Sequence, residues 1–253
     1  MHLFLAPHFD DVALSCGGEV ARVVSRGETA TIATIFGGAP PLAMPLTPYA
    51  RGHLVQWGVA SLEGAFRTRR AEDEAAARAL GATPHILPFV DGVFREDHYR
   101  SWDELRGQPV PAEADLSAQI VDMLVGSGLI GPDTTITGPL AIGRHVDHQL
   151  VYAAMRLLAA RGIPVRGYED FPYATQEDEY QARMRALRSP GRAHEMIDIT
   201  PWLETKIRAI ACYPSQLPSL FRGVPMPDAV RVYGTHVAGG RGVAERFWLP
   251  GVE

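Results

Sequence analysis

The chain has 253 residues, of which 46% are hydrophobic and 21% are charged, and its formal net charge is −5. This composition is typical of a globular protein with a sizeable core, and the acidic balance provides no basic surface for nucleic acid or an anionic membrane. No stretch reaches the ~18 apolar residues of a spanning helix, and the start lacks the basic segment of a signal peptide. Cys16 and Cys212 are too few for a disulfide framework. We therefore expect a cytoplasmic protein without a membrane span or a nucleic-acid partner.

Strands and helices are predicted to alternate along the chain. Apolar runs and helical spacing predict, in order, a strand at 3–6, a helix at 14–26, a strand at 29–36, a helix at 67–80, a strand at 85–89, a helix at 114–125, a strand at 134–137, a helix at 146–160, a strand at 165–168 and a helix at 201–213. This alternation indicates an α/β fold with a Rossmann-like, mainly parallel sheet and helices on both faces. No boundary is visible, so we predict a single domain over residues 1–253.

A long segment, residues 37–65, has no predicted helix or strand. It contains four prolines and shows no sustained hydrophobic period. A connection of this length inside a compact domain is usually functional, for example as a lid or a binding loop. We expect this loop and the C-terminal third of the chain to set substrate specificity.

The first candidate site is Pro7-His8-Phe9-Asp10-Asp11, directly after the first predicted strand. Ligands of open α/β sheets bind outside the carboxyl ends of the strands, and histidine with carboxylates is a ligand set for zinc. Taken alone, the run is explained equally well by a solvated loop with a carboxylate that caps the next helix.

The second candidate site is Gly143-Arg144-His145-Val146-Asp147-His148, which opens the helix after the strand at 134–137. His145 and His148 are three residues apart, so a helical turn brings them to one face. Two His/Asp clusters at strand ends can converge on one ion, which makes coincidence the poorer explanation. The sequence lacks the dinucleotide-binding, phosphate-binding and nucleophile-elbow glycine motifs. Metal-assisted hydrolysis is therefore the favoured reaction class.

These motifs resemble those of the PIG-L/LmbE family of zinc-dependent N-acetylglucosaminyl deacetylases and amidases. PHFDDVALSCGG, at residues 7–18, is similar to the family signature P-H-P-D-D-x-x-L-x-x-G-G, and HVDH, at 145–148, to its second motif H-x-D-H. The helix motif R-x-x-E-x-x-x-A-x-x-x-L-G is matched by Arg69, Glu72, Ala76, Leu80 and Gly81. Asp91-Gly92, YEDFPYA, KIRAIACYPSQ and AERF look similar too, so the likeness spans most of the chain.

The resemblance implies a role for eight residues and one Zn²⁺ per chain. The implied zinc ligands are His8, Asp11 and His148. The implied catalytic residues are Asp10 as general base, His145 as the group that assists the scissile carbonyl and the leaving amine, and Asp147 as the carboxylate that tunes this histidine. The implied substrate contacts are Arg69 and Asp91.

Two residues depart from the family pattern. Phe9 replaces the usual proline of the first motif, which alters the stiffness of the loop without supplying a ligand. Gly143 stands where some members have an active-site tyrosine, so this chain must do without that group or recruit another.

Some candidate site residues also have a purely structural explanation. Arg69 can pair with Asp73 along its helix, and Asp91 can simply open a turn with Gly92. Four residues at the end of a predicted strand either line a sugar pocket or pack in the core, namely Tyr168, Glu169, Asp170 and Tyr173.

Together these features predict a hydrolase that removes the N-acetyl group from an acetamido sugar or an N-acetylglucosamine conjugate. Its partner would be a small-molecule substrate, and a homo-oligomer is left open. One alternative is an amidase that cleaves a thiol or other acyl conjugate. Another is a catalytically silent sugar-binding protein on the same fold, although a pure binder has no use for Asp10 and His145.

Overall fold

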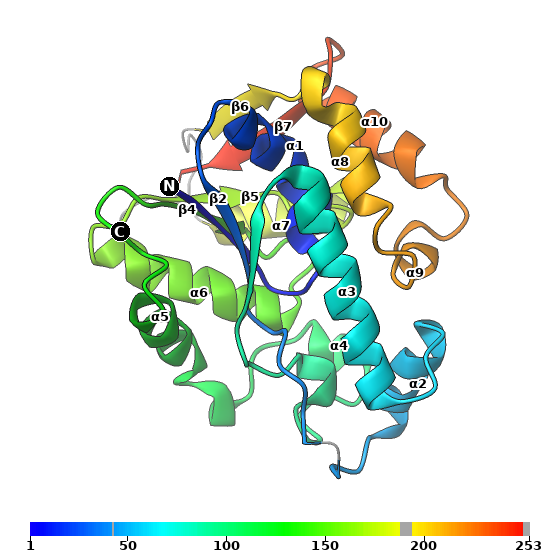
Figure 1. The fold of residues 1–253 in the computed structure, drawn as a ribbon. Coiled ribbons are helices and arrows are strands. Elements are labelled where there is room, and N and C mark those ends of the chain that lie inside the picture. The colour runs from blue at the N-terminus through cyan, green and yellow to red at the C-terminus, as the bar shows by residue number, and fades with distance from the viewer. Residues whose placement is uncertain (42, 188–193, 250–253) are drawn as a thin grey trace.

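The computed structural model describes residues 1–41, 43–187 and 194–249, and its strands form one seven-stranded sheet (Figure 1). The strands are β1 (His2–Ala6), β2 (Ala30–Thr34), β3 (Thr83–Ile86), β4 (Thr135–Pro139), β5 (Val165–Tyr168), β6 (His194–Asp198) and β7 (Ala244–Trp248). Their order across the sheet is β3-β2-β1-β4-β5-β7-β6. β1 to β5 are parallel, whereas β7 is antiparallel to both β5 and β6. The predicted mainly parallel α/β sheet is confirmed.

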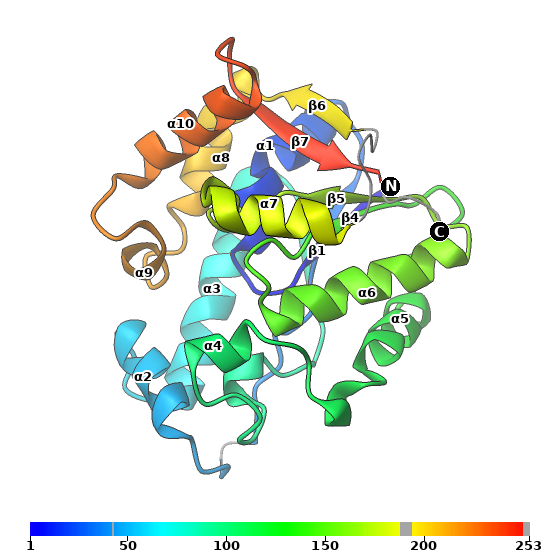
Figure 2. The same ribbon diagram turned by 180° about the vertical axis from the view of Figure 1, so that it is seen from behind.

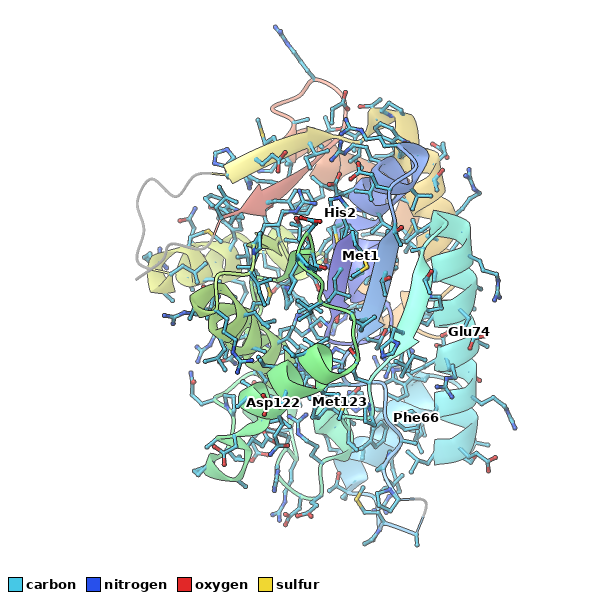
Figure 3. The ribbon with its side chains drawn as sticks, turned by 60° about the vertical axis from the view of Figure 1, so that its left-hand side comes forward. Met1, His2, Phe66, Glu74, Asp122 and Met123 are labelled. Carbon is cyan, nitrogen blue, oxygen red and sulfur yellow. The ribbon has the colours of Figure 1, made fainter. Side chains whose placement is uncertain are left out.

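Helices cover both faces of this sheet (Figures 1 and 2). One face carries α1 (Asp11–Ser25), α3 (Leu62–Leu80) and α8 (Leu203–Ile210), and the other carries α5 (Leu116–Gly126) and α6 (Val146–Ala160). In Figure 3, α3, marked by Phe66 and Glu74, and α5, marked by Asp122 and Met123, lie on either side of the strands. The other α-helices of the described residues are α2 (Pro48–Gln56), α4 (Trp102–Leu105), α7 (Glu177–Ala186), α9 (Leu217–Phe221) and α10 (Met226–Val237).

The side chains of β1 alternate between two cores. Leu3 and Leu5 pack with residues of α5 and α6, while Phe4 and Ala6 pack with residues of α1, α3 and α8. All four are fully buried. An uninterrupted apolar run is what a central strand covered on both faces requires.

Several predicted boundaries need correction. α6 and β5 have the predicted bounds, but α1 and α3 begin earlier, and β3 ends at Ile86 rather than at Phe89. The predicted long loop at 37–65 is wrong in part, because it contains α2 and the start of α3. Thr47 caps α2 by accepting the backbone N–H of Ala50, but only Ala50 and Leu54 are buried in this helix. Two apolar residues are too few to produce a detectable period.

Sequence patterns also missed β6, β7, α7 and α10. Ile197 is the one buried residue of β6, and α7 buries none of its residues. β6 and α7 bury too little surface to show the alternation on which such predictions depend. β7 lies inside the sheet and α10 buries Met226, Val230, Gly234 and Val237, so a pattern was present in these two elements but was not recognised.

The topology places a crevice at the carboxyl end of β1. The chain leaves β1 for β2 on one side and later returns to β4 on the other. Where connections diverge in this way, open α/β sheets bind their ligands. Met1 and His2, labelled in Figure 3, mark the opposite end of β1. None of the described helices is both long enough and apolar enough to cross a membrane.

Candidate metal centre

The two His/Asp clusters of the sequence meet at this crevice. His8 follows β1, and His145 and His148 follow β4. The ring centroid of His8 lies 4.7 Å from that of His145 and 5.3 Å from that of His148. Residues far apart in the chain are thus in contact because β1 and β4 are neighbours in the sheet.

Three side chains present one ligand atom each to a common point. Asp11 Oδ2 lies 3.4 Å from His8 Nδ1 and 3.3 Å from His148 Nε2. The three atoms lie within 4.8 Å of one another, close enough to hold one ion. Burial opposes ionisation of Asp11, but His148 and His8 hold the pKa of its carboxyl well below the usual range. The group is therefore a carboxylate, the form that binds a cation.

A second layer of carboxylates holds the two histidine rings. Nε2 of His8 lies 2.9 Å from Asp147 Oδ2, and Nδ1 of His148 lies 2.6 Å from Asp170 Oδ1. Histidines that ligate a metal usually donate their other ring N–H to such a carboxylate, which fixes the tautomer and the ring orientation. Two imidazole nitrogens and one carboxylate, with a position left open, are the donor set of catalytic zinc sites. The residues present therefore fit a zinc ion.

A different trio, formed by His8, His145 and Asp147, also has ligand atoms within reach of one another. In this trio, however, Asp147 is fully buried and its oxygens already accept hydrogen bonds from the N–H of Gly92 and from Arg95. The trio of His8, Asp11 and His148 borders the cleft described below, so it is the better candidate.

Asp147 lies near His145, the residue that it is predicted to tune, but closer to His8. Its Oδ2 is 4.0 Å from Nδ1 of His145 but only 2.9 Å from Nε2 of His8. The reason is that α6 begins at Val146 with His145 as its N-cap, and His145 Nδ1 accepts the backbone N–H of Asp147. The carboxylate consequently orients His8, whereas His145 is held by the helix backbone.

Asp10 is a buried carboxylate beside the ligands. It is the N-cap residue of α1, yet its side chain makes no capping hydrogen bond. Burial, with the neighbouring Asp11, raises its pKa to about 6, against the opposing effect of Arg69 and His8. A group with these properties can take up and release a proton near neutral pH.

Arg69 and Asp91 lie together at the side of the cleft. Arg69 Nη1 lies 3.3 Å from Asp91 Oδ2, and the guanidinium stacks 4.5 Å above the ring centroid of Trp57 and 5.3 Å from that of Phe9. Its buried Nε has no hydrogen-bond partner among the described residues. Arg69 therefore retains donor capacity. The alternative pairing with Asp73 does not form, because Asp73 accepts hydrogen bonds from Thr34 and Tyr213.

A cleft of about 540 Å³ opens above these groups. Its walls come from α2, α4, α9 and the segment after β5, and include Tyr49, Trp102, Arg106, Tyr173 and Leu220. This volume is in the range of sites that bind drug-sized ligands, so the cleft accommodates more than an acetamido group. α2 belongs to the segment 37–65, so part of that segment does line the cleft.

Tyr173 occupies the space beside Gly143. A Cβ at position 143 would lie 2.8 Å from Cγ of Tyr173, and the backbone of Gly143 has a φ of +87°, so any side chain there is strained. The ring of Tyr173 packs edge-on to His148, with the centroids 6.4 Å apart. Sequence reasoning left Asp170 and Tyr173 undecided between a pocket and the core. The sequence feature that could have favoured the pocket was their position directly after the carboxyl end of a strand.

Comparison with known proteins identifies the relatives of this chain. The sequence profile of the GlcNAc-PI de-N-acetylase (PIG-L) family matches residues 3–159. A 2'-N-acetylparomamine deacetylase of Niallia circulans is 31% identical over 232 residues, covering 87% of this chain and 82% of that protein. Another, of Streptomyces fradiae, is 32% identical over 264 residues, covering 98% and 89%. The solved zinc-inhibited form of the teicoplanin deacetylase Orf2 has a TM-score of 0.81 at 26% identity, covering 98% of this chain and 96% of that one.

Proposed function

This chain belongs to the GlcNAc-PI de-N-acetylase (PIG-L) family, and on that basis we propose that it is a zinc-dependent hydrolase that removes the N-acetyl group from an acetamido sugar within a larger conjugate. The names of its relatives, deacetylases of N-acetylparomamine and of teicoplanin, support sugar N-deacetylation. The observation that carries the proposal is the convergence of ligand atoms from His8, Asp11 and His148 beside the uncommitted carboxylate of Asp10.

His8, Asp11 and His148 would hold the zinc ion, which would supply Lewis acidity and lower the pKa of the attacking water. The proton transfers fall to Asp10. This carboxylate takes the proton of the attacking water while the new C–O bond forms at the amide carbon. It then passes the proton to the departing amine as the C–N bond breaks, so acetate and a free amino sugar are the products.

His145 and Tyr173 are the hydrogen-bond donors for the oxyanion that forms at the amide oxygen. Because Nδ1 of His145 accepts the N–H of Asp147, the ring proton is on Nε2 and is free to be donated. Burial, reinforced by Asp11 and Asp10, raises the pKa of Tyr173, so its phenol keeps its proton. Both side chains line the cleft, and Arg69 and Asp91 beside them bind the sugar.

The test is product formation by purified protein loaded with one equivalent of zinc. A relative is known in a zinc-inhibited form, so an excess of zinc is avoided. Substrates are N-acetylglucosamine, 2'-N-acetylparomamine, an N-acetylglucosaminyl glycopeptide and an acyl-thiol sugar conjugate. Acetate and primary amine are measured in parallel.

We expect acetate and amine in equal amounts from at least one acetylated sugar conjugate, and no product after zinc removal. Release of a larger acyl group alone would favour the amidase instead. Binding of the sugars by zinc-loaded protein without any hydrolysis would refute the proposal in favour of a silent sugar-binding protein.

A further inference from the structure

Helix α1 is broken in its first half, close to the candidate metal centre. Cys16 has a φ of −140° and a ψ of 24°, which lie outside the helical region. The break separates a short first part, which carries Asp11, from a second part that begins near Gly17. A helix end leaves backbone N–H and C=O groups without intrahelical partners, and in a buried place these need replacements.

Two buried side chains from other elements supply these replacements. Glu245 of β7 accepts the N–H of Gly18 at 2.9 Å and that of Glu19 at 2.7 Å. Lys206 of α8 reaches the carbonyl oxygen of Ser15, in the first part of the helix, at 3.5 Å. Nζ of Lys206 is also 2.7 Å from Glu245 Oε1. One ion pair thus caps both sides of the break.

The fit around this ion pair is close. A Cβ at Gly18 would lie 2.6 Å from Cδ1 of Ile199, and one at Gly17 would lie 3.3 Å from Cγ of Lys206. The two glycines after Cys16 therefore let α8 and the segment before it approach the break. Lys206 is the one lysine of the chain, against 23 arginines. The ammonium of lysine is more compact than the guanidinium of arginine, so it suits this closely packed position better.

Ser15 connects this clamp to the metal ligands. It lies one helical turn after Asp11 in the first part of α1. Its hydroxyl accepts the backbone N–H of Phe171 at 3.2 Å. Phe171 directly follows Asp170, whose carboxylate holds His148. The position of the break therefore bears on Asp11 directly and, through Asp170, on His148.

We propose that the Lys206–Glu245 ion pair, which we term the kink clamp, is a positioning device that sets the break in α1 and thereby aims Asp11 at the metal. The proposal rests on the zinc site of the proposed function. It concerns residues that touch neither the ion nor the substrate, so the clamp acts only through the helix.

The test measures zinc affinity by competition with a chromophoric chelator in Lys206→Met, in Glu245→Gln and in the double variant. Each is checked for native circular dichroism at the assay temperature. The matched control is Arg166→Met, which removes another buried ion pair to α1, between Arg166 Nη2 and Glu19 Oε1 at 2.6 Å, at a side chain that caps no backbone group of the break. Melting temperatures are recorded for all variants without zinc.

We expect both clamp variants to bind zinc about tenfold more weakly, the lower end of the loss seen when outer-shell partners of a metal are removed. The double variant should bind zinc no more weakly than the single variant with the lower zinc affinity, because both residues act through one clamp. Arg166→Met should lower the melting temperature but keep the wild-type affinity. Should Lys206→Met not fold, Glu245→Asp, which keeps the charge but withdraws it from the N–H of Gly18, should show the same loss.

Wild-type affinity in the clamp variants, or an equal loss in Arg166→Met, would overturn the inference and leave the zinc site intact. A wild-type protein that binds no zinc would instead refute the metal assignment, and the clamp's role with it.

Discussion

Replacing Asp170 with asparagine probes the layer of carboxylates behind the ligands. Asp170 is 1% exposed, and each of its two oxygens accepts one hydrogen bond, from His148 Nδ1 at 2.6 Å and from the N–H of Ile142 at 2.9 Å. The amide of asparagine has the same shape and can still accept the backbone bond, but it carries no charge. The variant thus removes mainly the charge-assisted bond to His148.

The expected size of the effect follows from that bond. Hydrogen bonds to charged groups contribute ~1.5–3 kcal/mol when buried. Outer-shell substitutions at metal sites cost ~10–100-fold in affinity, equivalent to ~1.4–2.7 kcal/mol. The two estimates agree, so Asp170→Asn should bind zinc ~10–100-fold more weakly than wild type.

The deficit should also depend on pH. In the metal-free protein, burial lowers the pKa of His148, but Asp11 and Asp170 together raise it to about 9. Zinc must displace that proton, so loss of Asp170 relieves part of the proton competition at neutral pH. The deficit should therefore be smaller at pH 7 than at pH 9.

Chelator competition at these two pH values is the assay. Glu169→Gln is the control, because this neighbouring buried carboxylate bonds Tyr233, Arg246 and Trp248 and not a ligand. An Asp170→Asn protein with wild-type zinc affinity at both pH values would show that the second layer does not support the metal. An equal deficit in Glu169→Gln would point to general destabilisation.

Three further outcomes are expected. Asp10→Asn should retain zinc by elemental analysis but lower kcat by ~10²–10⁴-fold, and wild-type turnover would make Asp10 a bystander. His145→Ala and Tyr173→Phe should each retain zinc and lose ~10²–10³-fold in kcat with little change in KM, whereas a loss confined to KM would assign them to binding alone. Burial raises the pKa of Asp73 from 3.8 to about 7, so the folded state binds more protons than the unfolded state between these values. The free energy of unfolding should accordingly fall by up to ~4 kcal/mol as pH rises through this range, and urea denaturation of Asp73→Asn should show a flatter profile.

Much of the fold could be predicted because its central elements are strongly patterned. The apolar run of β1 and the apolar spacing of α6 can be recognised locally, because each segment must bury these side chains. Elements that bury little, such as α2 and β6, carried no such pattern and were missed. For these two elements the limit is physical, because a segment that buries few residues shows little hydrophobic period.

Local sequence was also sufficient to expect the two His/Asp clusters near one another, since ligands follow the carboxyl ends of strands. The choice of His8, Asp11 and His148 within them came from the family resemblance. It could not identify the partners of Asp147 and Asp170, or pair Lys206 with Glu245 across the break in α1. Those contacts join segments whose distance depends on the strand order and on where each helix begins. α6 starting at Val146 turns Asp147 toward His8, and the place of β7 beside β5 brings Glu245 to α1. Such geometry is a property of the assembled layers, and no single segment encodes it.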